Sequence, residues 1–415
     1  MTVFFYNIFL LLYQFGIRIS SPFNPKAKKW LQGRKNIFKN LEAAIPKNEK
    51  IVWMHCSSLG EFEQGRPIIE RLKEQGTRHK ILLTFFSPSG YEVQKEYKGA
   101  DWVFYLPMDG AISAKKFLDI VNPSLVIFVK YDYWYFYLKK IKYRDIPLIL
   151  VSALFQKDSV FFKWYGFFYR KILTRFDHLF LQNEESKQLL STIGLGNKCT
   201  VSGDTRFDRV IEIAEKFEPI PMIEQFIGSN KCIVAGSTWK EDEELLNASK
   251  DFLEANELKL IIAPHEINQK HIEDLLKLFP QALLFSKFSG RSSNVLIIDN
   301  VGMLSKLYKY SYCAYVGGGL SHTGVHNVLE AAVFNKPVFF GTNYNKYQEA
   351  IDLINSNGAY AIKNKDEFIA LLNQLLLNSR LYNDISENAG QFVKNNTGAV
   401  KKIMNYIQEK RLLTS

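Results

Sequence analysis

Short apolar runs alternate with longer mixed segments along most of the chain. The expected strands are 51–55, 81–86, 102–107, 125–129, 148–152 and 178–182 in the first half, and 232–236, 260–264, 295–299, 313–317 and 337–341 in the second. These runs are apolar throughout rather than at alternate positions, which predicts parallel strands that helices cover on both faces. We therefore predict an α/β fold with one doubly wound sheet from each series of strands.

The same pattern divides the chain into parts. Two prolines interrupt the charged stretch that follows Gly203, and the second series of strands begins soon after it. This break predicts two domains, which is ordinary for a chain of 415 residues. We expect an apolar helix at 1–20, a Rossmann-like domain at 21–210, a linker at 211–230, a second Rossmann-like domain at 231–395 and a closing helix at 396–415.

The amino-terminal segment 2–17 is strongly apolar. As a helix it would extend about 24 Å, against a hydrocarbon core of about 30 Å. Between Arg18 and Lys50 there are nine basic residues and two acidic ones, which by the positive-inside rule keeps this flank cytoplasmic. We favour a helix that attaches the protein to a membrane. The alternative is an amphipathic helix docked on the protein itself.

A second segment, 161–176, carries eight aromatic and four basic residues and no acidic one. Such a mixture suits the headgroup layer of a membrane. It also suits a core helix with a basic, solvated edge. Nucleic-acid binding is a third interpretation, which we do not expect because no nucleic-acid-binding motif accompanies the segment.

Composition narrows the class of protein. With 47% hydrophobic and 23% charged residues, the chain is globular rather than disordered. Its net charge of +11 favours anionic partners such as phosphates, nucleic acid or an acidic membrane surface. The four cysteines are far apart and form no C-x-x-C pair, which argues against a zinc ribbon or a disulfide scaffold.

The first candidate site follows the strand expected at 51–55. Ser57, Ser58 and Gly60 form a turn there, and Glu61 opens the next helix. Ligands of open α/β sheets bind beyond the carboxyl ends of strands, so a carboxylate at this place is a candidate catalytic group. The alternative is that Glu61 only caps the helix.

The second candidate site lies between 316 and 341. Three glycines follow a strand, polar residues crowd the loop after them, and we expect a helix to start near Asn327. Exposed backbone N–H groups and a helix amino terminus predict an anion site, although a glycine turn for close packing is the alternative. The pattern is not the dinucleotide fingerprint, because position 322 is His322. Elsewhere in this half, His265 ends a strand, and Thr238 with Glu241 fits a capping box.

Three motifs in order resemble those of the 3-deoxy-manno-octulosonic acid (Kdo) transferases. They are H-C-S-S-L-G-E at 55–61, G-D-T-R-F-D at 203–208 and G-G-G-L-S-H-T-G-V-H-N-V-L-E at 317–330. The resemblance covers nearly the whole chain. It implies a GT-B fold of two Rossmann-like domains with the site in the cleft between them. It also implies inverting transfer of Kdo from CMP-Kdo to a lipid A precursor at the cytoplasmic face of the inner membrane.

The resemblance also assigns roles to residues. It implies that Glu61 is the catalytic base and that the carboxy-terminal domain holds the nucleotide sugar. It places Gly318, Gly319, Ser321, His326, Asn327 and Glu330 in the CMP-binding region. We also expect Ser58, Gly60, Lys130, Asp132, Arg206 and His265 to bind substrate. We expect no cofactor and no metal, because no D-x-D pattern follows a strand, and no nucleic-acid partner.

The chain departs from the family pattern in three places. Where the family often reads M-E-T-E-L-W, residues 129–134 read V-K-Y-D-Y-W, so one carboxylate is Lys130 and the other is the shorter Asp132. The family's P-R-H is A-P-H at 263–265, and its K-F-D has Arg206. Two other functions stay open on these residues. One is a different GT-B enzyme, such as a UDP-sugar transferase or an epimerase, and the other is a silent, membrane-attached nucleotide-binding protein.

Overall fold

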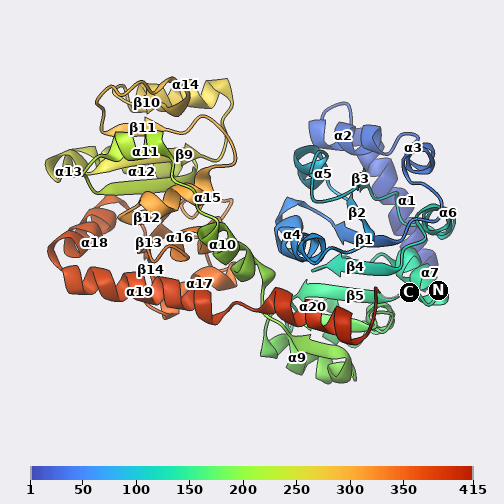
Figure 1. The fold of residues 1–415 in the computed structure, drawn as a ribbon. Coiled ribbons are helices and arrows are strands. Elements are labelled where there is room, and N and C mark those ends of the chain that lie inside the picture. The colour runs from blue at the N-terminus through green and yellow to red at the C-terminus, as the bar shows by residue number, and fades with distance from the viewer. Residues whose placement is uncertain (1, 414–415) are drawn as a thin grey trace. The chain divides into compact units, whose positions relative to one another are not determined.

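The computed structural model describes residues 2–413, which fall into two compact units. Unit 1 runs to Asp208 and resumes at Gly398, whereas unit 2 runs from Arg209 to Thr397. The segment 211–230, which we expected to be a linker, contributes to two helices and belongs to unit 2. Most of the closing segment 396–415 belongs to unit 1 (Figure 1).

Unit 1 contains a sheet of seven parallel strands. These are β1 (Ile51–Cys56), β2 (Lys80–Phe85), β3 (Trp102–Tyr105), β4 (Leu125–Val129), β5 (Leu148–Ala153), β6 (His178–Leu181) and β7 (Cys199–Val201). Their order across the sheet is β3-β2-β1-β4-β5-β6-β7. The chain moves outward from β1 in one direction and from β4 in the other, so the topological switch point, where such sheets bind ligands, lies between these two strands.

Helices cover both faces of this sheet. They are α1 (Thr2–Ser20), α2 (Pro25–Gly33), α3 (Ile37–Ala44), α4 (Leu59–Glu74), α5 (Pro88–Gln94), α6 (Ala111–Val121), α7 (Tyr135–Tyr143), α8 (Phe167–Leu173), α9 (Glu184–Ser191), α10 (Thr205–Glu215, which continues into unit 2) and α20 (Ala399–Glu409). Successive residues of β1 point to opposite faces. Trp53 joins one buried cluster, with residues of α6 and α7, whereas Met54 joins another, with residues of α4 and α20.

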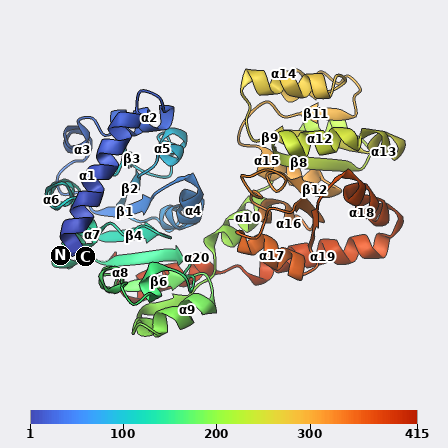
Figure 2. The same ribbon diagram turned by 180° about the vertical axis from the view of Figure 1, so that it is seen from behind.

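Helix α1 lies along the outside of unit 1 (Figure 2). Leu10 is buried, and the Tyr6 hydroxyl donates to Asp109 Oδ2 at 2.7 Å, so one side of the helix is docked on the protein. The other side exposes large apolar side chains, such as Phe4 and Leu11, which are 64% and 66% exposed. Within the described residues, Val3–Ser20 is long and apolar enough to cross a membrane. The structure therefore combines a docked face with an uncovered apolar face.

The aromatic and basic segment 161–176 divides in a similar way. Phe161 and Phe176 are buried, whereas Trp164 and Phe167 are exposed. Arg170 donates to the carbonyl oxygens of Phe161 and Lys163, so this cation is held by the backbone. The segment therefore contributes to the core and also presents aromatic rings at the surface.

Unit 2 also contains a parallel sheet of seven strands. These are β8 (Cys232–Thr238), β9 (Lys259–Pro264), β10 (Leu283–Leu284), β11 (Val295–Ile297), β12 (Cys313–Val316), β13 (Val338–Gly341) and β14 (Ala359–Ile362), in the order β10-β11-β9-β8-β12-β13-β14. Its helices are α11 (Pro221–Ile227), α12 (Lys240–Ala248), α13 (Lys250–Ala255), α14 (Gln269–Leu278), α15 (Leu304–Leu307), α16 (Leu329–Ala332), α17 (Gln348–Asn355), α18 (Lys365–Leu377) and α19 (Ser379–Asn395). The switch point here lies between β8 and β12.

The structure confirms two doubly wound α/β units and all eleven expected strands. Three edge strands, β7, β10 and β14, were not expected. The helix that we expected near Asn327 begins at Leu329 and has only four residues. A helix this short has a small dipole, so the anion site predicted at its start receives little support from the helix.

Candidate active site

Glu61 lies in the first turn of α4, directly after β1. The Ser58 N–H and the Ser58 hydroxyl donate to Glu61 Oε2 at 2.8 and 3.1 Å, which forms a capping box. The capping interpretation of Glu61 is therefore confirmed, and any catalytic role comes in addition to it. Burial raises the pKa of Glu61, while the bonds from Ser58 and the charge of Lys130 oppose that shift. Gly60 is exposed and a Cβ there would meet nothing within 4 Å, so the chain is open to solvent at the residue before Glu61.

Asp132 lies beside this turn, in the loop that follows β4. The Ser57 hydroxyl donates to Asp132 Oδ1. Asp132 Oδ2 is 3.4 Å from His55 Nε2 and has no hydrogen-bond partner, although the side chain is only 5% exposed. The first site therefore contains a buried carboxyl group with one unsatisfied oxygen.

The neighbours of His55 decide the charge on Asp132. Trp134 Nε1–H can only donate, and it lies 3.2 Å from His55 Nε2, so this ring nitrogen is an acceptor. His55 Nδ1 then carries the proton and donates to Thr84, and burial lowers the pKa of His55 to about 3. An ionised Asp132 would thus face a lone pair rather than a cation.

His55 therefore offers Asp132 no positive charge, which favours the protonated form of this carboxyl group. Burial, followed by the negative charge of Glu61, raises the pKa of Asp132 well above its ordinary value. The contact between Asp132 and His55 is not an ion pair, because burial keeps the His55 ring neutral. Glu61 is then the carboxylate that can accept a proton from a ligand at this site.

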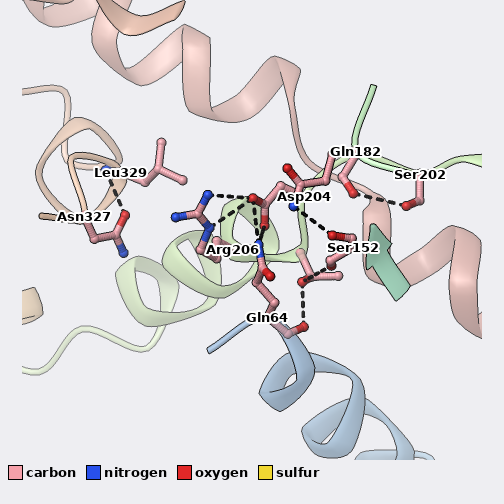
Figure 3. Close-up of polar contacts among 10 residues, drawn as sticks. Gln64, Ser152, Gln182, Ser202, Asp204, Arg206, Asn327 and Leu329 are labelled. Carbon is pink, nitrogen blue, oxygen red and sulfur yellow. Dashed lines mark hydrogen bonds and ion pairs between the residues drawn. The ribbon is translucent and has the colours of Figure 1, made fainter. Parts of the chain in front are cut away.

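Lys130 and Arg206 supply the positive charges of unit 1's site. Lys130 has a positive φ of 64° at the end of β4, a strained conformation of the kind that clusters at functional sites. Arg206 binds Asp204 through Nη2 and Nε, at 2.8 and 3.0 Å from Oδ2 (Figure 3). Gln64 Nε2 of α4 also donates to the same carboxylate. Although burial opposes it, Arg206 holds the pKa of Asp204 below its ordinary value.

Asp208, the last residue of the second motif, caps a distant helix. Its carboxylate accepts the N–H groups of Gly398 at 2.9 Å, Ala399 at 3.0 Å and Val400 at 3.3 Å, at the start of α20. The chain leaves unit 1 directly after Asp208 and returns at Gly398. One carboxylate therefore holds together the two chain segments that lead to and from unit 2.

In unit 2, three rings stack beyond the carboxyl ends of β8 and β9. The ring centroid of His265 lies 4.7 Å from that of Trp239 and 4.5 Å from that of His326, and the interplanar angles are 24° and 26°. Trp239 Nε1 donates to His326 Nε2 at 3.0 Å, which leaves the proton of His326 on Nδ1. Burial lowers the pKa of His326 to about 4 and also lowers that of His265, so both rings are neutral at pH 7.

The three glycines after β12 are packed closely. A Cβ on Gly317, Gly318 or Gly319 would lie within 2.3 to 2.6 Å of backbone atoms of neighbouring segments, and Gly318 has a φ of +89°. The Gly318 N–H donates to Asp242 at 2.8 Å, so it does not point to a ligand. The close-packing interpretation therefore accounts for these glycines. Binding by Gly318 and Gly319 stays a prediction that concerns the shape of the loop.

The polar residues of this loop also bind one another. The Ser321 hydroxyl donates to the Gly318 carbonyl oxygen at 3.0 Å. Asn327 Nδ2 donates to Glu330 Oε1 at 3.1 Å, and Asn327 Oδ1 accepts the Leu329 N–H. The loop is thus organised before any ligand binds.

The expected capping box of α12 is shifted by one residue. Thr238 is the last residue of β8, and its hydroxyl donates to Glu243 rather than capping the helix. The carboxylate that accepts the Trp239 N–H is that of Asp242 at 2.9 Å, not Glu241. Asp242 also accepts the Tyr315 hydroxyl at 2.7 Å.

Sequence reasoning missed the residues that support these sites. They are Gln64, Asp204, Trp239 and Asp242, together with the roles of His55 and Ser57. Asp204 and His55 lie within the recognised motifs, so their positions were a usable signal. Gln64 and Asp242 lie on helices outside these motifs, and the sequence gives no signal for them. Among residues 2–413, no group of three or more His, Cys, Asp or Glu side chains is arranged to hold a metal ion.

A family profile and several curated relatives name the same family. The family profile described as 3-Deoxy-D-manno-octulosonic-acid transferase (kdotransferase) matches residues 31–209. The chain is 30% identical over 348 residues to the 3-deoxy-D-manno-octulosonic acid transferase of Aquifex aeolicus, which covers 82% of this chain and 88% of that protein. It is 25% identical over 426 residues to the enzyme of the same name from Haemophilus influenzae, with 98% of each covered.

The fold also matches solved structures. A UDP-GlcNAc 2-epimerase from Neisseria meningitidis, solved with UDP-GlcNAc, has a TM-score of 0.63 to this chain and is 18% identical to it. The match covers 87% of this chain and 100% of that one. At this identity the likeness shows the fold alone, and it confirms the GT-B class.

Proposed function

Because the chain belongs to the 3-deoxy-D-manno-octulosonic acid (Kdo) transferase family and is therefore a glycosyltransferase, we propose that it transfers Kdo from CMP-Kdo to a lipid A precursor. The observation that supports this proposal most is the environment of Glu61. Its carboxylate lies at the switch point of unit 1 and accepts hydrogen bonds from Ser58, and the charge of Lys130 opposes the rise in its pKa that burial causes.

In the proposed reaction, Glu61 is the general base. A hydroxyl oxygen of the acceptor sugar attacks the anomeric carbon of Kdo while its proton passes to a Glu61 oxygen. The bond from that carbon to the phosphate oxygen breaks, and its electron pair leaves with CMP. Attack from the face opposite CMP inverts the anomeric centre. The raised pKa of Glu61 makes it a stronger base than an ordinary carboxylate, and Lys130 keeps it ionised.

The donor carries a phosphate and a carboxylate, so it needs cations and N–H donors. We propose Lys130 and Arg206 of unit 1 as the cations. The neutral rings of His265 and His326, with the loop at 317–327, would supply donors in unit 2. His265 then takes over part of the role of the arginine that the family has at position 264, where this chain has Pro264. No step of this scheme requires a metal ion, and we propose a metal-independent enzyme.

We place the reaction at the cytoplasmic face of the inner membrane. The exposed apolar side of α1 fits a membrane, and the basic flank that follows it fits an anionic surface. A lipid acceptor would reach the enzyme from that surface.

The test is transfer by the purified protein. It is incubated with CMP-Kdo, a tetraacyl disaccharide lipid A precursor and a chelator, and the product mass is followed. We expect a gain of one or more Kdo masses. Transfer from a UDP-sugar instead of CMP-Kdo would contradict the proposal that CMP-Kdo is the donor. Transfer that stops when chelator is added would contradict the proposal that the enzyme needs no metal ion.

The role of Glu61 is tested with Glu61→Gln. Glutamine retains the capping box, so the variant should fold like the wild type. We expect turnover to fall by at least a hundredfold, the lower range for loss of a general base, while CMP binding is kept. The control is Glu74→Gln at the other end of α4, where turnover should be unchanged. Normal turnover of Glu61→Gln would refute the base assignment.

A further inference from the structure

A pocket with a volume of about 420 Å³ opens in unit 1 beside Asp132. It is formed by α1, by the loop between β4 and α7, and by α8. Its lining consists of Phe5, Tyr6, Phe9, Tyr131, Asp132, Tyr133, Trp134, Phe168 and Tyr169. Every lining residue except Asp132 is aromatic, and its size is typical of a pocket that binds a small ligand.

The polar atoms of this lining are largely used within the protein. The Tyr6 hydroxyl donates to Asp109, and Trp134 Nε1 donates to His55. Asp132 Oδ1 accepts the Ser57 hydroxyl. Burial and the charge of Glu61 raise the pKa of Asp132, which favours its uncharged form. The surface left for a ligand is therefore mainly apolar, which disfavours a sugar, since a bound sugar needs hydrogen-bond partners for its hydroxyl groups.

The pocket is also held in shape. Asp109 accepts the Tyr6 hydroxyl as well as the N–H groups of Phe136 and Tyr137 at the start of α7. The rings of Tyr135 and Phe168 stack at 5.1 Å. The walls therefore exist before a ligand binds, and α1 is fixed to them.

The pocket lining combines two kinds of surroundings. Phe5 and Phe9 of α1 are 60% and 57% exposed and belong to the helix that is apolar enough to cross a membrane. Asp132 is hydrogen-bonded to Ser57, in the turn that precedes Glu61. An occupant that suits both is apolar and belongs to a molecule whose polar group reaches Glu61.

We propose that this pocket binds one acyl chain of the lipid acceptor and so places the acceptor sugar at Glu61. The proposal rests on the proposed function in one respect, namely that the acceptor is acylated. It goes beyond that function because it gives the aromatic lining a role in acceptor selection. The acyl chain contributes affinity through burial, at about 0.8 kcal/mol for each methylene group.

The first experiment compares acceptors of different chain length. Disaccharide acceptors with long and short acyl chains are presented in the same detergent to the wild type and to the double variant Phe5→Ala/Phe9→Ala. The control is Phe4→Ala/Phe15→Ala, which removes two exposed phenylalanines of α1 that do not line the pocket. Both pairs lower the apolarity of α1 equally.

We expect the wild type and the control to have a lower KM for the long chains. In the pocket variant, KM for the long-chain acceptor should rise about tenfold, which corresponds to lost contact with roughly two methylene groups, while kcat is kept. KM for the short-chain acceptor should not change. Equal effects of both variant pairs, or no dependence on chain length in the wild type, would overturn the proposal.

The second experiment measures binding without turnover. A fatty acid brominated along its chain is titrated into protein that carries Trp164→Phe, which removes a tryptophan that is 90% exposed. We expect saturable quenching of the fluorescence, and loss of this quenching when Trp134→Phe is added. Quenching that does not depend on Trp134 would refute the pocket. If the pocket binds the chain but no Kdo is transferred, the proposed function fails and the pocket stands.

Discussion

Asp132 has the protonation state that the structure constrains most tightly, and Asp132→Asn tests it. Asparagine has the shape of the neutral acid. Its oxygen can accept the Ser57 hydroxyl, and its NH₂ group takes the place of Asp132 Oδ2, which lies 3.4 Å from His55 Nε2. The exchange therefore keeps the hydrogen bond with Ser57 and adds no charge, and we expect transfer activity to be retained. Removing one partner of a true buried ion pair would instead destabilise by about 3–5 kcal/mol.

The size of the expected effect follows from the way the free energy of unfolding changes with pH. An unfolded aspartate titrates near 3.9, and burial raises the pKa of Asp132 in the folded protein. Above about pH 4 the unfolded chain has released this proton while the folded chain holds it. The free energy of unfolding then falls by about 1.4 kcal/mol for each pH unit, until the folded carboxyl group also ionises. An asparagine side chain does not titrate, so Asp132→Asn should gain stability relative to the wild type as pH rises.

The assay is urea unfolding of both proteins at pH 5, 6 and 7 in one detergent. Asp119→Asn serves as the control, because Asp119 is paired with Lys115 and Arg144 and its pKa is lowered by their hydrogen bonds and charges. The free energy of unfolding of this control, relative to the wild type, should not increase from pH 5 to pH 7. A gap between Asp132→Asn and the wild type that stays constant or shrinks from pH 5 to pH 7 would refute the neutral acid.

Two further changes test the surroundings of the site. Lys130 lowers the pKa of Glu61, so Lys130→Met should move the acid limb of the pH profile of kcat/KM to higher pH. Lys130→Arg keeps the charge and should leave this limb in place. An unmoved limb in Lys130→Met would contradict the coupling between the two residues. Asp208 caps α20, so Asp208→Ala, which removes both acceptor oxygens, should destabilise that helix by about 0.5–2 kcal/mol. Hydrogen exchange should then quicken in α20 but not in α19, and equal protection of α20 in both proteins would refute the cap.

The sequence was sufficient to predict the strands that lie inside each sheet. Their residues are apolar on both faces, and this pattern needs no knowledge of the partners. The three strands that were missed are the edge strands β7, β10 and β14, which are short and only partly buried. Such strands have a neighbour on one side only, and their pattern resembles that of loops. The packing of α20 on unit 1 depends on contacts with α4, more than 300 residues earlier in the chain, which no local pattern reports.

The candidate site was predictable where one motif carries it and not where separate segments meet. The turn before Glu61 could be located because it follows β1. The neutral state of Asp132 could not, because it depends on Trp134 fixing the tautomer of His55. The glycine loop was predicted to bind anions through N–H groups, but Asp242 of another segment takes the Gly318 N–H. In each case the sequence indicates which groups are available, whereas the fold decides which of them are already used.

The departures at positions 130 and 132 fit together through their charges. The family pattern has carboxylates at both positions, and a chain with Glu61 would then carry three in one site. Here Lys130 is a cation, Asp132 is neutral and Arg206 offsets Asp204, so the local charge is close to zero with Glu61 ionised. A donor that carries a phosphate and a carboxylate would meet less repulsion at such a site, and unlike charges attract most where water is excluded. If the proposed function holds, the two departures leave Glu61 as the base and lower the negative charge that an anionic donor would meet.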